Sequence, residues 1–89
     1  MTNAQVRVRL ADFGKQVRYV RQSLGMTQRE LDRRSHVGYR FISELEIGKE
    51  NPSLATVLRL ADGLGCELSD LFPPQLNVRM PNTALGREL

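Results

Sequence analysis

The 89-residue chain contains one cysteine, one histidine and no tryptophan. Cys66 has no partner for an internal disulfide, and no second cysteine or nearby histidine could share a metal ion with it. These shortages exclude a small scaffold held by disulfides and a zinc finger. We interpret Cys66 as a small core residue, and we expect neither a metal nor a cofactor.

The sequence also lacks long apolar runs. No stretch reaches the roughly 18 apolar residues that suggest a membrane-spanning helix, and no hydrophobic segment follows the first charges of the N-terminus. The sequence therefore predicts neither a membrane span nor a secretory signal, and we expect a cytoplasmic protein. With 40% apolar residues, the chain is long enough for one small core and one domain.

Positive charge is concentrated in the first half of the chain. Residues 1–40 carry nine Lys or Arg against three Asp or Glu, whereas residues 41–89 carry four against seven. Eleven of the thirteen cations are arginines, whose planar guanidinium suits phosphates and guanine edges. This composition favours a polyanionic partner, although solvated helices can also be rich in arginine.

Apolar spacing and capping residues predict the first two helices. The first has Asp12 in its first turn, carries apolar residues at the spacing of one helical face, and ends at Gly25. The second covers about 28–34, because Thr27 and Glu30 stand three residues apart in the pattern of a capping box. The end of the first helix and the start of the second are thus each indicated by residues close to them in the sequence.

Two further helices are predicted by the same signals. A third helix should cover about 39–47, with Gly38 as its N-cap and Gly48 at its end. A fourth should follow the N-cap Ser53 and end at Gly65. Only three or four residues separate the second and third helices.

The expected fold class is therefore all-α. Ser69 is expected to cap a last short helix that runs through Phe72, which completes a five-helix domain over residues 11–72. Residues 1–10 form an N-terminal arm and residues 73–89 a C-terminal tail.

Apolar and polar residues alternate in both end segments. The apolar members are Val6, Val8 and Leu10 in the arm, and Leu76, Val78 and Met80 in the tail. Such alternation predicts short β-strands, and because an isolated pair of strands is marginally stable, they would join a sheet across a dimer interface. The alternative is that both termini lack regular structure, and a tail of this kind could also serve as a partner-binding segment.

Two short helices joined by a tight turn are typical of a helix-turn-helix, whose second helix enters the major groove of DNA. Steps of about 100° per residue give the third helix an apolar face of Phe41, Ile42 and Leu45. The opposite face holds Arg40, Ser43 and Glu44, with Tyr39 beside them at the helix N-terminus. One face packs, and the other is free to contact DNA.

The polar face carries suitable chemistry for base contacts. Arg40 can donate two hydrogen bonds to guanine, Glu44 can accept one from cytosine, and Tyr39 can donate its hydroxyl or cover a thymine methyl. We assign Ser43 to the same base-contacting set. The alternative for Glu44 is an intrahelical pair with Arg40, four residues earlier.

A second set of residues is expected to contact phosphates. Gln28 and its neighbouring amides lie at a predicted helix N-terminus, which favours anions. Arg29, Lys49 and Asn51 complete this set around the groove. Such contacts position a protein on DNA without selecting a sequence.

Several motifs over residues 11–72 occur together: Val17-Arg18, Arg21, Leu24-Gly25-Met26-Thr27-Gln28, Leu31, Ile42-Ser43-Glu44-Leu45-Glu46, Gly48-Lys49, Asn51-Pro52-Ser53-Leu54, Leu60-Ala61, Leu64-Gly65 and Leu71-Phe72. In these motifs the chain resembles the lambda-repressor/Cro-like family of five-helix DNA-binding domains, also called the XRE family. The resemblance implies prokaryotic transcriptional regulation, dimeric binding to palindromic double-stranded operators, and Gln28 on a phosphate or a base.

The resemblance also implies a structural salt bridge between Arg21 and Glu46. Two departures from the family pattern stand at the start of the third helix. Gly38 replaces the usual small hydroxylated residue, and Tyr39 is bulkier than the glutamine or serine often found next. The operator sequence therefore cannot be predicted.

Two functions of different class are compatible with the sequence. The first is a stand-alone DNA-binding regulator, expected to be a repressor. The second is an antitoxin that binds a kinase-type toxin and its own promoter, because the 40–46 stretch resembles antitoxins that partner HipA-type kinases. An enzyme is not expected, since the only histidine, His36, has no catalytic partner at a defensible spacing.

Overall fold

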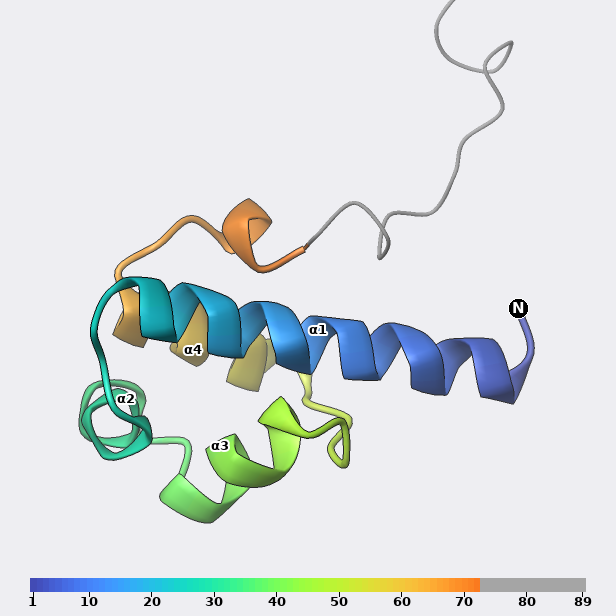
Figure 1. The fold of residues 1–89 in the computed structure, drawn as a ribbon, viewed down its shortest axis with the longest axis horizontal. Helices are drawn as coiled ribbons and strands as arrows, with labels where there is room; N and C mark the ends of the chain where they lie inside the picture. Colours follow the sequence, from blue (N-terminus) through green and yellow to red (C-terminus); the bar gives the residue numbers. More distant parts are fainter. Residues whose placement is uncertain (73–89) are drawn as a thin grey trace, which may run out of the picture.

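The computed structural model describes residues 1–72, which form four α-helices and a short 3₁₀ helix (Figure 1). In chain order the elements are α1 (Asn3–Ser23), α2 (Gln28–Ser35), α3 (Tyr39–Glu46), α4 (Leu54–Leu64) and η1 (Leu68–Leu71). The all-α prediction is confirmed, and no strand occurs within the described residues. The strand predicted over 76–80 lies outside them.

The N-terminal strand prediction is wrong, because residues 3–10 are the first turns of α1. Thr2 caps this helix: its hydroxyl accepts from the amide of Gln5 at 3.1 Å, and its amide donates to the Gln5 side chain at 2.7 Å. Three alternating apolar residues are compatible with both a strand and a helix. In this helix Val6 is less exposed than Val8, which is 60% exposed. In Figure 1 these turns of α1 project beyond the other helices.

The later helix boundaries agree with the sequence to within one residue, except at η1. Ser69 was expected to cap the last helix, but η1 begins at Leu68 and Glu67 is its N-cap. The amide of Glu67 donates to the Asp70 carboxylate at 2.9 Å, so Asp70 fixes the start of the turn. Leu71, which is fully buried, anchors η1 to the core.

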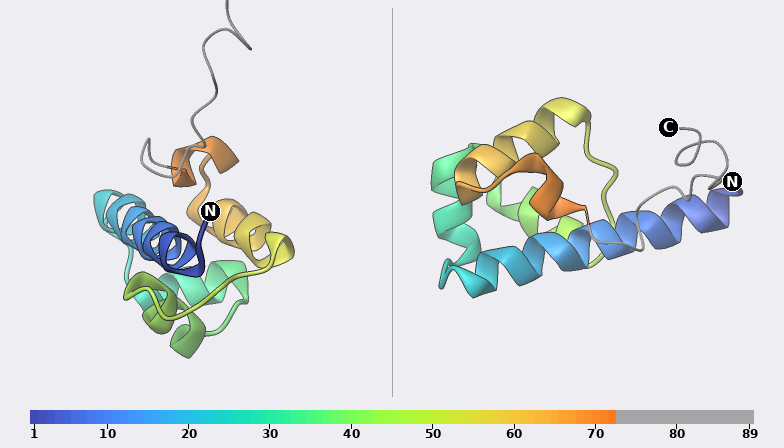
Figure 2. Two further views of the ribbon diagram at one scale, coloured as in Figure 1. Left: turned by 90° about the vertical axis from the view of Figure 1, so that its right-hand side faces the viewer. Right: turned by 90° about the horizontal axis from the view of Figure 1, so that it is seen from above.

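Side chains from all five elements meet in one core. Figures 1 and 2 show α1 beside α4, with α2 and α3 on one side of this pair and η1 on the other. Burial of apolar side chains from every element provides the main stabilisation of such a small domain. The core consists of Phe13, Val17, Met26, Leu31, Ile42, Leu45, Val57, Leu60, Ala61, Leu64 and Leu71.

Two glycines allow helices to approach closely. A Cβ at Gly14 of α1 would overlap the carbonyl oxygen of Leu45 in α3. A Cβ at Gly63 of α4 would lie 2.8 Å from the Cβ of Ser35 in α2. The position of α3 against the rest of the domain therefore depends on the missing side chain at residue 14.

Gly14→Ala should destabilise the fold by about 1–3 kcal/mol, since overpacking outweighs the gain of roughly 0.5–1 kcal/mol from alanine in a helix. Urea denaturation followed by circular dichroism measures the change. Lys15→Ala, on the exposed side of α1, is the matched control and should alter stability by less than about 0.5 kcal/mol. An unchanged or higher urea midpoint for Gly14→Ala would contradict the close contact.

Candidate nucleic-acid interface

The N-terminus of α2 is held by the capping box predicted from the sequence. The Thr27 hydroxyl accepts from the Glu30 amide at 3.0 Å, and the Thr27 amide donates to the Glu30 carboxylate at 2.7 Å. The hydrogen bond from the Thr27 backbone lowers the pKa of Glu30 below its usual value. The amides of Gln28 and Arg29, at the first two positions of α2, have no carbonyl within the helix to bind, so they are suited to an anion.

The turn between α2 and α3 is fixed by Asp32, a residue that the sequence analysis did not identify. Its carbonyl accepts from the amide of His36, whose φ of 59° is left-handed, at 2.8 Å. Its carboxylate accepts from the amide of Gly38 at 2.9 Å. Gly38, at φ of 100°, is the N-cap of α3 as predicted. The Asp32 carboxylate thus joins α2 to the N-cap of α3.

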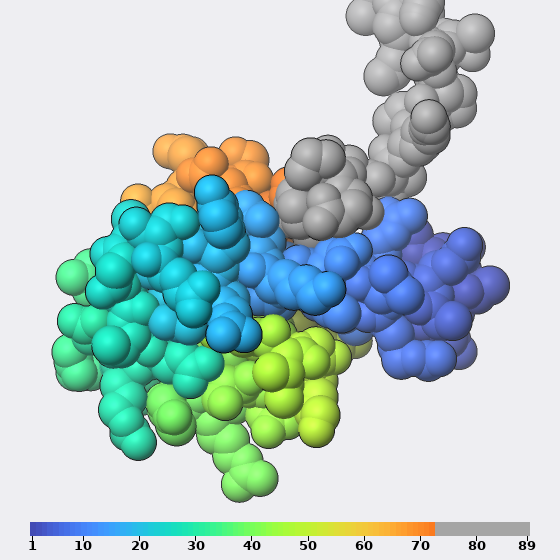
Figure 3. Space-filling model, viewed as in Figure 1, coloured from blue at the N-terminus to red at the C-terminus, as the bar shows by residue number. Residues whose placement is uncertain are grey.

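The two faces of α3 differ as the helical spacing predicts. Ile42 and Leu45 are fully buried, whereas Arg40 is exposed, Tyr39 is 39% exposed and Ile47 is 58% exposed. Ser43 and Glu44 are half-buried on the exposed side. In Figure 3 the α2 and α3 segments form the surface of the domain below α1. No ion pair joins Arg40 to Glu44 in the part of the chain that the structure describes, so the intrahelical alternative is not formed.

Arg29 and Tyr39 are in contact across the turn. The guanidinium carbon of Arg29 lies 4.2 Å from the centre of the Tyr39 ring, which is a cation–π geometry. Both residues are predicted site residues, Tyr39 for base contact and Arg29 for phosphate contact, and the structure brings them together. The stack joins the first turn of α2 to the first residue of α3.

Arg21 and Glu46 form a buried two-pronged ion pair. The Arg21 Nε donates to Oε2 of Glu46 at 2.7 Å, and a terminal nitrogen donates to Oε1 at 2.9 Å. The other terminal nitrogen donates to the carbonyl of Met26 at 2.7 Å. The hydrogen bond to Glu46 raises the pKa of Arg21, so the guanidinium stays charged. The pair joins α1 to the end of α3.

Gln28 belongs to the same cluster. Its side-chain nitrogen donates to Oε1 of Glu46 at 3.0 Å, which the sequence analysis did not foresee. The amide group is therefore oriented by a buried carboxylate, and its oxygen and the backbone amide of α2 are the parts left to face a ligand. No local pattern signals this contact, because the two residues are eighteen positions apart.

Lys49 and Asn51 lie just after α3 and are both exposed. The amide of Lys49 donates to the carbonyl of Glu44 at 2.9 Å, and that of Gly48 donates to the carbonyl of Leu45 at 3.0 Å. This Schellman arrangement ends α3 at a glycine with φ of 82°. It holds Lys49 beside the C-terminal end of the exposed face.

Three further features of residues 1–72 concern cysteine, metal ligands and apolar helices. Cys66 is half-buried against the core, and burial raises the pKa of its thiol. No group of three metal-ligating side chains occurs in this part of the chain. None of its helices combines the length and the apolar character needed to cross a bilayer.

A short capped helix, a turn and a second helix with one buried and one exposed face define a helix-turn-helix domain. Residues 17–71 match the helix-turn-helix family model, so the chain belongs to this family, whose members include transcriptional regulators. The protein is accordingly a helix-turn-helix transcriptional regulator.

Relatives of known name agree with this assignment. The chain is 41% identical over 63 residues to an uncharacterized HTH-type transcriptional regulator, y4mF, of Sinorhizobium fredii, covering 71% of this chain and 83% of that protein. It is 38% identical over 61 residues to the competence pilus inhibition repressor of Acinetobacter baylyi, covering 68% of this chain and 56% of that protein.

A solved structure shows the same fold. The restriction-modification controller protein C.AhdI from Aeromonas hydrophila superposes with a TM-score of 0.69 at 33% identity, covering 71% of this chain and 96% of that one. The names of these proteins favour regulation of transcription, and the antitoxin alternative is not favoured.

Glu46→Ala should destabilise the protein by about 3–5 kcal/mol, because it leaves the buried guanidinium of Arg21 without its anion. Thermal or urea denaturation measures the loss. The double variant Arg21→Met with Glu46→Leu removes both charges and should recover much of the stability. A single variant as stable as the parent, or a double variant no more stable than the single one, would contradict this role for the pair.

Proposed function

We propose that the protein binds a specific double-stranded DNA sequence by inserting α3 into the major groove. The observation that carries the proposal is the division of α3, in which Ile42 and Leu45 are fully buried whereas Tyr39 and Arg40 are exposed and Ser43 and Glu44 are partly exposed. A B-DNA major groove admits an α-helix presented in this way. The fold thus leaves the side chains of α3 available for contacts with bases.

Four residues of α3 form the proposed base-contacting set: Tyr39, Arg40, Ser43 and Glu44. Arg40 is exposed at the second position of α3 and can reach guanine O6 and N7. Glu44 lies one turn further along and can accept from cytosine N4. Each good pair discriminates against a wrong base by about 1–3 kcal/mol.

The proposed phosphate contacts form two groups, one near each end of α3. Arg29, held by its stack on Tyr39, and the amides at the start of α2 form one group. Exposed Lys49 and Asn51 form the other. Because these groups flank the exposed helix, they can bind the two DNA strands that border one groove.

We further propose that two copies bind a palindromic operator. With eight residues, α3 is about 12 Å long and spans only about three or four base pairs. Two such helices about 34 Å apart on one face of the duplex double the sequence that is read. Similarity to a named repressor supports repression as the outcome, with bacterial DNA in the cytoplasm as the target.

Arg40→Ala should weaken binding to the selected operator by about 1–3 kcal/mol per site and relax the preference at one base pair. The operator is first selected from a random library and then tested with single base changes by fluorescence anisotropy. Arg59→Ala, on the exposed side of α4, is the matched control and should keep the preference. An equal loss on operator and random DNA would contradict base contact by Arg40.

Lys49→Ala should weaken binding to all sequences alike. Loss of one phosphate contact should also reduce the slope of log K against log salt by about 1. Titrations of operator and random DNA at several salt concentrations measure both effects. A selective loss on the operator, with the salt slope unchanged, would place Lys49 among the residues that contact bases.

A further inference from the structure

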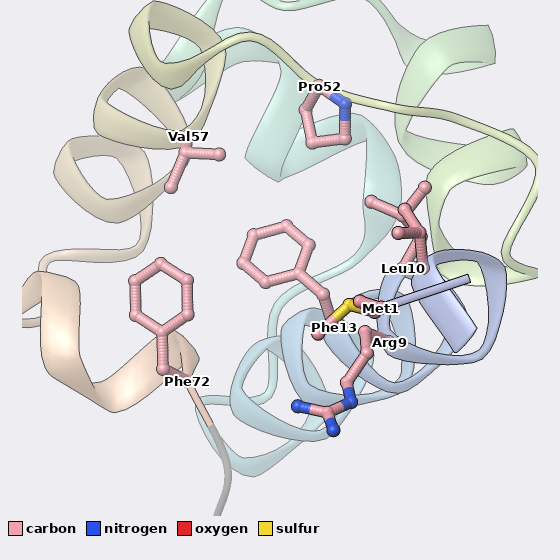
Figure 4. Close-up of a pocket in the computed structure, with 8 residues that line it drawn as sticks. Met1, Arg9, Leu10, Phe13, Pro52, Val57 and Phe72 are labelled. Atoms are coloured by element: carbon pink, nitrogen blue, oxygen red, sulfur yellow. The ribbon is translucent and has the colours of Figure 1, made fainter. Parts of the chain in front are cut away.

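An apolar groove lies beside the first turns of α1, away from the helix-turn-helix. Its volume is about 260 Å³. Figure 4 shows the side chains of Phe13, Val57 and Phe72 pointing into the same space. Most of its lining is apolar and includes Met1, Val6, Leu10, Phe13, Val57 and Phe72.

The walls of this groove leave large apolar side chains exposed to water. Met1 is 71% exposed, and Val6 and Phe72 are each about two fifths exposed. The rings of Phe13 and Phe72 are 5.7 Å apart, so Phe72 continues the apolar surface from α1 to the end of η1. Adjacent exposed apolar residues of this kind mark a surface that binds another apolar partner.

We propose that residues 76–80 of the same chain occupy this groove, with Leu76, Val78 and Met80 against its apolar lining. In an extended segment these three side chains point to one face, and Asn77 and Arg79 point to the other. One face therefore meets the groove, and the polar face meets solvent. The assignment does not depend on the proposed DNA contacts.

The chain path favours this occupant. Phe72, itself a wall of the groove, is extended at φ of −113° and ψ of 93°. Two prolines follow it and restrict the backbone, so less conformational entropy is lost when the next residues bind. Leu76 is four residues beyond Phe72 and can reach about 13–14 Å from it.

The dimensions of the segment and the groove also agree. Val6, Leu10 and Phe13 lie along one face of α1, over a length of about 10 Å. In an extended segment, the positions from 76 to 80 span about 13 Å. The apolar side chains of the segment can thus lie along the apolar residues of α1.

A second copy of the chain fits the groove less well. Stable interfaces between proteins use about 20–30 residues on each side, so a second copy would have to bind much more of the surface than the groove itself. A segment tethered at Phe72 needs far less contact area, because its effective concentration at the groove is in the millimolar range. The small size of the groove therefore favours a segment of the same molecule.

Methyl NMR of the full chain tests the proposal. Leu76→Ser with Val78→Ser should shift the methyl signals of Val6, Leu10 and Val57 to their positions in a chain truncated after Pro74. The signals of Leu31, which is fully buried in the core, should stay unchanged and report that the fold is intact. The matched control, Asn77→Ser with Arg79→Ser, changes only the polar face and should leave the groove signals as in the parent.

Identical groove signals in the parent, the truncated chain and the Leu76→Ser, Val78→Ser variant would overturn the proposal. A spin label at Asn77→Cys, in a Cys66→Ser background, identifies the molecule that supplies the segment. It should broaden the Val6 and Leu10 methyls of its own chain at every protein concentration. Broadening of an isotope-labelled chain by a spin-labelled chain without isotope would instead show that a second copy supplies the segment, which would also overturn the proposal.

Discussion

The arrangement of the domain depends on the buried pair between Arg21 and Glu46. Arg21 comes from α1, Glu46 is the last residue of α3, and Gln28 of α2 donates to the same carboxylate. Three helices therefore meet at one charged group with short, directional hydrogen bonds. Together with the close approach of α3 to Gly14, these bonds fix the end of α3 against α1 and α2.

A second anchor fixes the other end of α3. Asp32 holds the turn before the helix by accepting from the amides of His36 and Gly38. Between these anchors, Ile42 and Leu45 bury one side of the helix completely. Because both ends are set by the protein itself, the polar face is presented without help from a ligand, and binding loses little entropy in ordering it.

The sequence predicts those features that local chemistry determines. The boundaries of α2, α3 and α4 follow from capping residues and glycines a few positions apart, and these agree to within one residue. The prediction of a strand over residues 6–10 is wrong, because three alternating apolar residues are compatible with both a helix and a strand. The Thr2 and Gln5 capping box, which decides between them, was not recognised.

Contacts between distant positions are harder to predict from one sequence. The bond between Gln28 and Glu46 and the stack of Arg29 on Tyr39 each join separate helices. Both depend on the angle at which α2 and α3 meet. The salt bridge between Arg21 and Glu46 was predictable from the resemblance to a known family, but not from the residue types alone.

The contact between Arg29 and Tyr39 links a cation near the start of α2 to the first side chain of α3. Under the proposed base contact, replacing Tyr39 to suit a different base would also release the guanidinium of Arg29. If Arg29 binds a phosphate as proposed, a change of target through Tyr39 would lower affinity for every sequence until another residue restored the orientation of Arg29. Changes of specificity in this protein should therefore arise in pairs, with position 29 and position 39 varying together.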